Sequence, residues 1–204
     1  MRWLLVVLLL AGCTQVSIEV TPAAVEPSVE QLEQLTVQGR GAKTGYSRAA
    51  FGPAWADVDR NGCDTRNDIL ARDLVEETFR RGTCVVLSGE LAEPYTGRTV
   101  QFVKARAFEV QIDHVVALSD AWQKGAAQWP YPRRLAFAND PLNLLAVDGR
   151  ANQEKGDGDT ATWLPPYKPF RCAFVSKQVA VKQKYGLTVT KAEREAMARV
   201  LARC

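Results

Sequence analysis

The stretch from residue 110 to residue 159 limits the possible folds most strongly, because its residues follow the order strand, loop, strand, helix. Apolar residues alternate around Ile112, which predicts a strand that ends at His114. A second apolar run, residues 144–147, predicts another strand. Asp148 and Gly149 then favour a tight turn, and the residues from Arg150 onward favour a short helix. We therefore predict a ββα unit within an α+β domain.

The polar residues of this unit have the chemical types that phosphodiester hydrolysis needs. Asp113 and Asn152 offer hard oxygen ligands, which suit Mg²⁺ or Mn²⁺. His114 is the single histidine of the chain, and its neutral imidazole can accept a proton from water. Asn143 precedes the second strand, where its amide can hydrogen-bond the loop after His114 and hold the imidazole in position. We predict a catalytic role for His114, supported by Asn143, and metal binding by Asp113 and Asn152.

At these positions the sequence resembles the HNH endonuclease family, whose pattern is a histidine often preceded by Asp, a central Asn, and a final His or Asn on the helix. The pattern falls on Asp113–His114, Asn143 and Asn152. Residues 61–68, 112–122 and 161–166 are similar to exported HNH-family proteins of bacteria. The resemblance implies a small antiparallel sheet that carries a ββα-metal motif surrounded by helices. It also implies endonuclease activity on DNA, with RNA as the alternative. Asn152 in the last position argues against zinc.

Four basic residues are candidates for contacts with substrate phosphate: Lys155, Arg133, Arg134 and Arg66. The chain has 26 Lys and Arg and 23 Asp and Glu. Only Arg2 and four glutamates precede residue 40, so the remainder holds 25 basic and 19 acidic residues, a net charge of +6. A basic domain suits a polyanionic substrate, although many basic surfaces are merely solvated.

The start of the chain has the features of an export signal. A basic Arg2 precedes an apolar run too short to span a bilayer, and residues 10–13 (Leu-Ala-Gly-Cys) resemble the bacterial lipobox. We predict a signal peptide over residues 1–12, a lipid on Cys13, and a flexible tether over residues 13–45 that buries little. The nuclease domain then spans residues 46–204, anchored by lipid at the bacterial cell envelope and facing away from the cytoplasm.

The other four cysteines form an even set that allows three pairings, as suits an exported domain held by disulfides. We favour Cys63 with Cys84 and Cys172 with Cys204. The second pair follows from two predicted helices, residues 170–185 and 191–203, which the short connection at Gly186 makes antiparallel. Thr190 and Glu193 match a capping box at the start of the last helix. A zinc site is the rival for these cysteines, but they lack paired C-x-x-C spacing.

Two interpretations compete for residues 57–68. Asp57, Asp59, Asn61 and Asp68 match positions of a calcium loop, but Gly52-Pro53 precedes the segment where a flanking helix is expected, and Cys63 lies inside it. We favour the other interpretation, in which Asn67 or Asp68 caps a helix that runs to Arg80. Residues 84–87 and 99–103 predict two strands that extend the sheet beside the ββα unit. Residues 119–124, and a segment that begins at Arg133, predict two short helices.

The best-supported function is thus a metal-dependent endonuclease, which we expect to be monomeric. Two alternatives belong to other classes. One is a lipoprotein that binds nucleic acid or cell-wall polymer without turnover. The other is a calcium-stabilised envelope protein whose HNH-like residues are structural.

Overall fold

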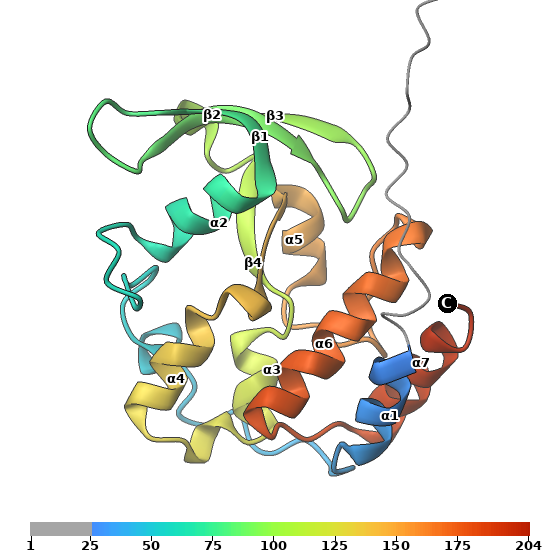
Figure 1. Cartoon of the computed structure of the whole chain (residues 1–204). Coiled ribbons are helices and arrows are strands. Elements are labelled where there is room, and N and C mark those ends of the chain that lie inside the picture. The colour runs from blue at the N-terminus through green and yellow to red at the C-terminus, as the bar shows by residue number, and fades with distance from the viewer. Residues whose placement is uncertain (1–25) are drawn as a thin grey trace, which may run out of the picture.

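The computed structural model describes the backbone of residues 26–204 and the side chains from residue 29 onward (Figure 1). The predicted signal sequence and Cys13 lie outside the described residues. The fold is α+β, with two separate antiparallel sheets. The principal helices are α1 (Glu26–Gln34), α2 (Thr65–Asp73), α3 (Leu118–Gln123), α4 (Tyr131–Ala138), α5 (Gly149–Lys155), α6 (Arg171–Tyr185) and α7 (Lys191–Leu201). Within the described part, no helix has the length and apolarity to span a membrane.

A three-stranded sheet forms one end of the molecule, at the top of Figure 1. Its strands are β1 (Leu74–Phe79), β2 (Val86–Ala92) and β3 (Thr99–Val103), paired in that order. The strand predicted over residues 99–103 is confirmed, whereas the one predicted over residues 84–87 begins at Val86 and runs to Ala92. Their expected place in one sheet with the active unit is wrong. That unit has its own sheet, β4 (Val110–His114) with β5 (Leu144–Asp148).

The helix expected to run to Arg80 ends at Asp73, and β1 follows it directly. Asp64 caps α2, since its carboxylate accepts a hydrogen bond from Asn67 N at 2.8 Å. The spacing of Leu70 and Leu74 suits a helix, and both side chains are buried. Beyond Leu74, however, the backbone groups pair with β2, and Phe79 is 42% exposed. Tertiary pairing thus overrides the helical pattern.

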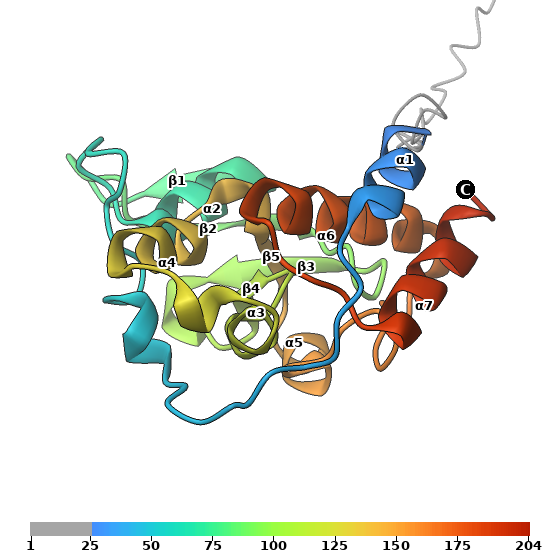
Figure 2. The same cartoon turned by 90° about the horizontal axis from the view of Figure 1, so that it is seen from below.

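The segment before residue 46 is folded onto the domain, so the expected flexible tether is wrong for residues 26–45. Leu32 of α1 and Leu35, which follows the helix, are buried in one hydrophobic cluster with residues of α6 and α7. Gln38 N donates to Val189 O at 2.9 Å, and Val37 and Val189 form a parallel bridge. Figure 2 shows α1 beside α6 and α7. The partners of Leu32 lie far along the chain, so a local pattern did not reveal them.

A buried cluster of charged side chains links the helices α3, α6 and α7. Lys124, which has no exposed side-chain surface, contacts Asp120 at 2.6 Å, Asp159 at 2.9 Å and Glu193 at 2.6 Å. Arg40 reaches Asp120 at 3.0 Å and Asp159 at 2.7 Å, and so joins the N-terminal segment to this cluster. Lys182, also fully buried, contacts Asp120 and Glu193 as well. Asp159, in the loop that follows α5, is therefore held by two cations, Lys124 and Arg40.

Both expected disulfides are present, Cys63–Cys84 and Cys172–Cys204. The second joins the start of α6 to the residues after α7, as the antiparallel arrangement predicts. Gly186 ends α6 in the left-handed conformation, which glycine adopts without steric cost. The capping box of Thr190 and Glu193 is also confirmed.

Candidate active site

The predicted ββα unit is formed by β4, β5 and α5. His114 pairs with Leu144, and Val110 pairs with Asp148 at the other end of the hairpin. The Asp148 side chain then caps α5, accepting a hydrogen bond from Ala151 N at 2.8 Å. The next residue, Gly149, has to be glycine, because a Cβ atom there would lie 2.1 Å from Phe108 O. Strand pairing and this close turn bring α5 against the strand that carries Asp113 and His114.

His114 is held in one tautomer. Its Nε2 lies 2.8 Å from the carbonyl oxygen of Ala138, the last residue of α4. A carbonyl can only accept, so Nε2 carries the proton and Nδ1 keeps its lone pair. Burial is the main reason that the pKa of His114 falls from 6.5 to about 3, and the nearby Arg48 guanidinium lowers it further. The imidazole is consequently neutral at neutral pH, with an unprotonated lone pair on Nδ1.

Asn143 holds the loop that follows His114, in the geometry predicted for it. Its Oδ1 accepts from Val116 N at 2.8 Å, and its Nδ2 donates to Val116 O at 3.2 Å. A backbone hydrogen bond from Val115 N to Asn143 O, 2.8 Å long, lies beside them. Asn143 is completely buried. Its amide therefore hydrogen-bonds the backbone of this loop and has no direct access to substrate.

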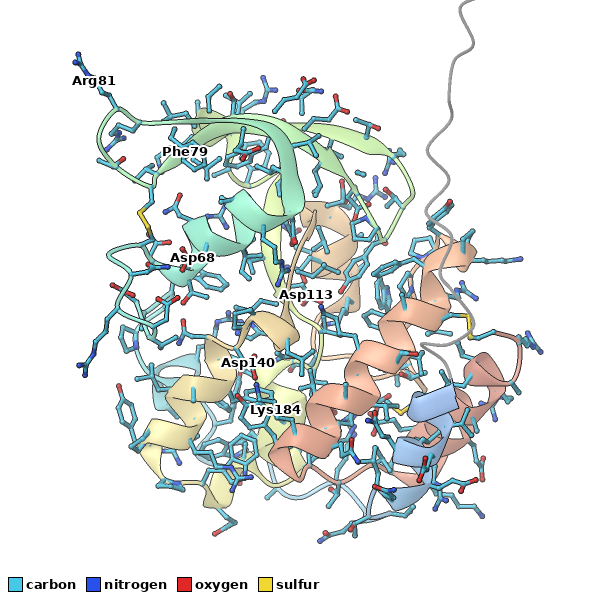
Figure 3. The ribbon with its side chains drawn as sticks, in the orientation of Figure 1. Asp68, Phe79, Arg81, Asp113, Asp140 and Lys184 are labelled. Atoms are coloured by element: carbon cyan, nitrogen blue, oxygen red, sulfur yellow. A yellow bond between two sulfur atoms is a disulfide. The ribbon has the colours of Figure 1, made fainter. Side chains whose placement is uncertain are left out.

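Asp113 is buried and already has two side-chain partners. Lys155 Nζ donates to Oδ1 at 2.9 Å, and the hydroxyl of the buried Tyr95 donates to Oδ2 at 2.5 Å. Lys155 Nζ also donates to the carbonyl oxygen of His114, at 2.9 Å. Burial raises the pKa of Asp113, against the opposing effect of Lys155. Figure 3 shows Asp113 in the interior of the molecule.

A polar pocket of about 230 Å³ opens beside these groups. It is lined by Asp113, His114 and Asn152, so three of the predicted site residues share one space. Asn152 Nδ2 donates to Gln111 Oε1 at 2.9 Å, which leaves the Asn152 carbonyl oxygen as the available ligand atom. The pocket also includes three residues that sequence reasoning missed, Tyr46, Arg48 and Asp157.

Arg48 is the basic side chain best placed to meet a phosphate. It is exposed at the edge of the polar pocket, and no ion pair or hydrogen bond engages its guanidinium within the described part of the chain. Ser47 caps the short 3-10 helix that carries it, residues 48–51. A serine followed by an arginine is too common to have marked this position in the sequence.

None of the four basic residues predicted from the sequence lines the polar pocket, and their role in substrate binding stays a prediction. Lys155 has no exposed side-chain surface and lies beneath the site. Arg66 donates to Val110 O at 3.2 Å. Arg133 donates to Tyr185 O at 2.8 Å, and Arg134 donates to Ala50 O at 2.7 Å. Each of the four side chains therefore donates to at least one backbone carbonyl oxygen.

The segment with the calcium-like pattern is organised by its own hydrogen bonds. Asp57 accepts from Asn61 N and Gly62 N, at 3.1 and 3.0 Å, and Asn61 donates to Asp68 Oδ1 at 3.2 Å. Within the described residues, no group of three or more His, Cys, Asp or Glu side chains is arranged to hold a metal. Calcium binding by Asp57, Asp59, Asn61 and Asp68 stays an untested prediction, which a melting curve in millimolar Ca²⁺ can check.

The ββα unit thus presents a neutral histidine in a fixed orientation. Residues 64–200, about two thirds of the chain, match the family described as GmrSD restriction endonucleases, C-terminal domain. The chain belongs to this family and is a nuclease-family domain. It is also 38% identical over 206 residues to an "Uncharacterized secreted protein" of Arthroderma benhamiae, a match that covers 96% of this chain and 98% of the relative. No solved structure matches. The secreted relative and the two disulfides are consistent with export.

Proposed function

We propose that the protein is an HNH-type endonuclease that hydrolyses phosphodiester bonds of DNA, with RNA as the alternative, outside the cytoplasm. The observation that carries the proposal is the tautomer of His114. Because Ala138 O accepts the Nε2 proton, the basic lone pair is on Nδ1, and the ring is neutral at physiological pH. Nδ1 takes a proton from water as the water oxygen attacks phosphorus, and the bond from phosphorus to the leaving oxygen breaks.

The oxygen donors of the polar pocket fit a hard divalent cation. The Asp113 carboxylate keeps unused lone pairs beside its two partners, and the Asn152 carbonyl oxygen is available in the same pocket. Mg²⁺ or Mn²⁺ held there would neutralise charge on the scissile phosphate and on the leaving oxygen. Since Lys155 already compensates Asp113, we expect these residues to bind the cation weakly until a substrate phosphate joins them.

Arg48 supplies the phosphate contact in this proposal. An exposed guanidinium beside the pocket can form charge-assisted hydrogen bonds with phosphate oxygens. Arg48→Ala should weaken binding for every sequence and reduce the salt dependence of binding by about one phosphate contact. Arg81→Ala is the matched control, because Arg81 extends from the distant β1–β2 turn, where Figure 3 labels it.

The decisive experiment is cleavage of plasmid DNA and of RNA by the full chain with Mg²⁺ or Mn²⁺, with and without chelator. His114→Ala should lower the rate by about 10²–10⁴, the usual effect of losing a general base. If His114→Ala and the parent protein cleave equally at saturating cation, the HNH assignment fails. A parent protein that binds nucleic acid but never cleaves it would favour the alternative, a binding lipoprotein without turnover.

We also propose that Cys13 is lipidated and anchors the protein at a bacterial cell envelope. The support is the Leu-Ala-Gly-Cys sequence after a short apolar run. In a bacterial host the parent protein should partition with membranes, and Cys13→Ser should remain uncleaved or appear in the soluble fraction. Equal partitioning of both proteins would exclude the anchor and leave simple secretion.

A further inference from the structure

A second pocket adjoins the polar pocket and differs from it in chemistry. It encloses about 340 Å³, and its walls include Phe51, Pro53, Trp55 and Asn139. We call it the Trp55 pocket. His114, Arg48 and Leu118 line both pockets, so the two are neighbouring spaces that share the histidine and the exposed arginine. A ligand that enters both would pass directly beside His114.

The walls of the Trp55 pocket suit a flat aromatic group. The indole of Trp55 is partly buried and lies nearly parallel to the His114 ring, with 11° between the planes and 5.9 Å between the centroids. The backbone at Trp55 has φ of +59°, a conformation that costs energy for a bulky residue and that recurs at ligand-binding segments. An apolar, aromatic pocket would not accept a phosphate, but it would accept a nucleobase.

A polar group in the wall lacks a partner. The side chain of Asn139 is buried, and its Nδ2 donates to Leu135 O at 2.9 Å, which fixes the orientation of the amide. Its Oδ1 is buried and accepts no hydrogen bond from the described residues. Buried acceptors are normally satisfied, and every nucleobase carries N–H donors on its edge. Asn139 is one of the residues that line the pocket, so a buried acceptor without a donor among the described residues belongs to its wall.

We propose that the Trp55 pocket receives one unstacked base of the substrate while the adjacent phosphodiester lies in the polar pocket beside Arg48 and His114. The enzyme would therefore act on single-stranded nucleic acid in preference to duplex. This inference rests on the proposed nuclease function, because the phosphodiester is the group attacked by the water that His114 deprotonates. A base inside a duplex would first have to be unstacked and unpaired, which lowers the rate.

Binding measured in chelator separates this proposal from hydrolysis. The probes are a short, labelled DNA single strand and a fully abasic strand of the same length, which carries the same charge. The full-length parent protein should bind the strand with bases about 5- to 150-fold more tightly, the range expected for stacking of one base. Trp55→Ala should largely remove this difference, and Trp55→Phe should restore most of it.

Two further variants guard against misfolding and non-specific effects. Ala49→Phe changes an exposed residue that lines the pocket, so it should occupy the pocket without disturbing the core and should also remove the difference. Phe79→Ala deletes an exposed aromatic ring of β1 and should leave the difference intact. The proposal is overturned if the parent protein binds both strands equally, or if Trp55→Ala and Ala49→Phe both keep the full difference.

Cleavage then tests the preference for single strands. With Mg²⁺ or Mn²⁺, the parent protein should cut a single strand faster than the duplex of the same sequence, and Ala49→Phe should reduce that ratio. Equal rates on the two substrates would overturn the preference. Base-dependent binding that Trp55→Ala abolishes, without cleavage of either substrate, would support the pocket while refuting the nuclease function.

Discussion

Lys155 illustrates how burial changes the role that a residue type suggests. Its ammonium group has no exposed surface and joins the Asp113 carboxylate to the carbonyl of His114. It therefore holds the end of β4 from the interior of the protein. A motif that ends in a lysine does not by itself indicate a phosphate contact.

Lys155→Met should lower the free energy of unfolding by about 3–5 kcal/mol, because it leaves the buried Asp113 charge without its cation. Chemical denaturation can measure the loss. Lys191→Met, at an exposed position on α7, provides a control expected to change stability little. The double variant Asp113→Asn with Lys155→Met should recover part of the stability. A loss of nucleic-acid binding with unchanged stability would contradict this role for Lys155.

The lowered pKa of His114 predicts how stability responds to acid. The folded-state pKa is about 3 and the unfolded value is 6.5, so the unfolded chain binds the proton more readily between these values. The contribution of His114 to stability is fully present above pH 6.5 and is lost as the pH falls toward 3. His114→Gln removes this linkage, so its melting temperature should fall less than that of the parent protein between pH 7 and pH 4. Parallel falls in both proteins would contradict the shift.

Among the elements, the short 3-10 helix η5 (Pro141–Asn143), which leads into β5, holds the loop after His114 through Asn143. Asn143→Ala would leave the buried N–H and C=O of Val116 without their side-chain partner, which should cost about 1–3 kcal/mol. The rate of cleavage should fall as well, while the affinity for nucleic acid in chelator stays close to that of the parent protein. A variant with parent-like stability would show that the amide does not hold the loop.

Local elements were predictable where their signals lie close together in the chain. The strands β4 and β5, the helix α5 and the pair α6 and α7 follow from short patterns, turns and caps. The end of α2 was not predictable, since Leu70 and Leu74 are buried in a helix-like spacing although Leu74 begins a strand. The same limit applies to the site. Arg48 lines the same pocket as His114, and its segment is joined to α4 by a hydrogen bond from Arg134 to the carbonyl oxygen of Ala50, 84 positions away.

At the scale of the whole molecule, the N-terminal segment is part of the folded body. Leu32 packs into the cluster that contains Val189 and Met197, and Arg40 and Lys43 pair with Asp159 and Asp157 after α5. The part of the chain that matches the family begins only at residue 64. The segment before it therefore supplies both core and site residues that the family match does not include.

Leu32→Ala should lower the free energy of unfolding by about 2–5 kcal/mol, the usual cost of truncating a buried leucine. Val29→Ala is the matched control on the same helix, because Val29 is 42% exposed and should change stability by less than about 0.5 kcal/mol. Thermal or chemical denaturation of the full chain measures both. Equal, negligible effects would restore the interpretation of this segment as a tether.

The Cys172–Cys204 disulfide has a consequence for survival among extracellular proteases. It closes a covalent ring that contains α6, the connection at residues 186–190, and α7. A single peptide bond cut within that connection opens the ring but releases no fragment. The severed α7 would stay attached, with Glu193 still against Lys124 and Lys182. A nicked molecule would thus run as one piece on a gel without reductant and as two pieces with it, and it would still be a folded protein.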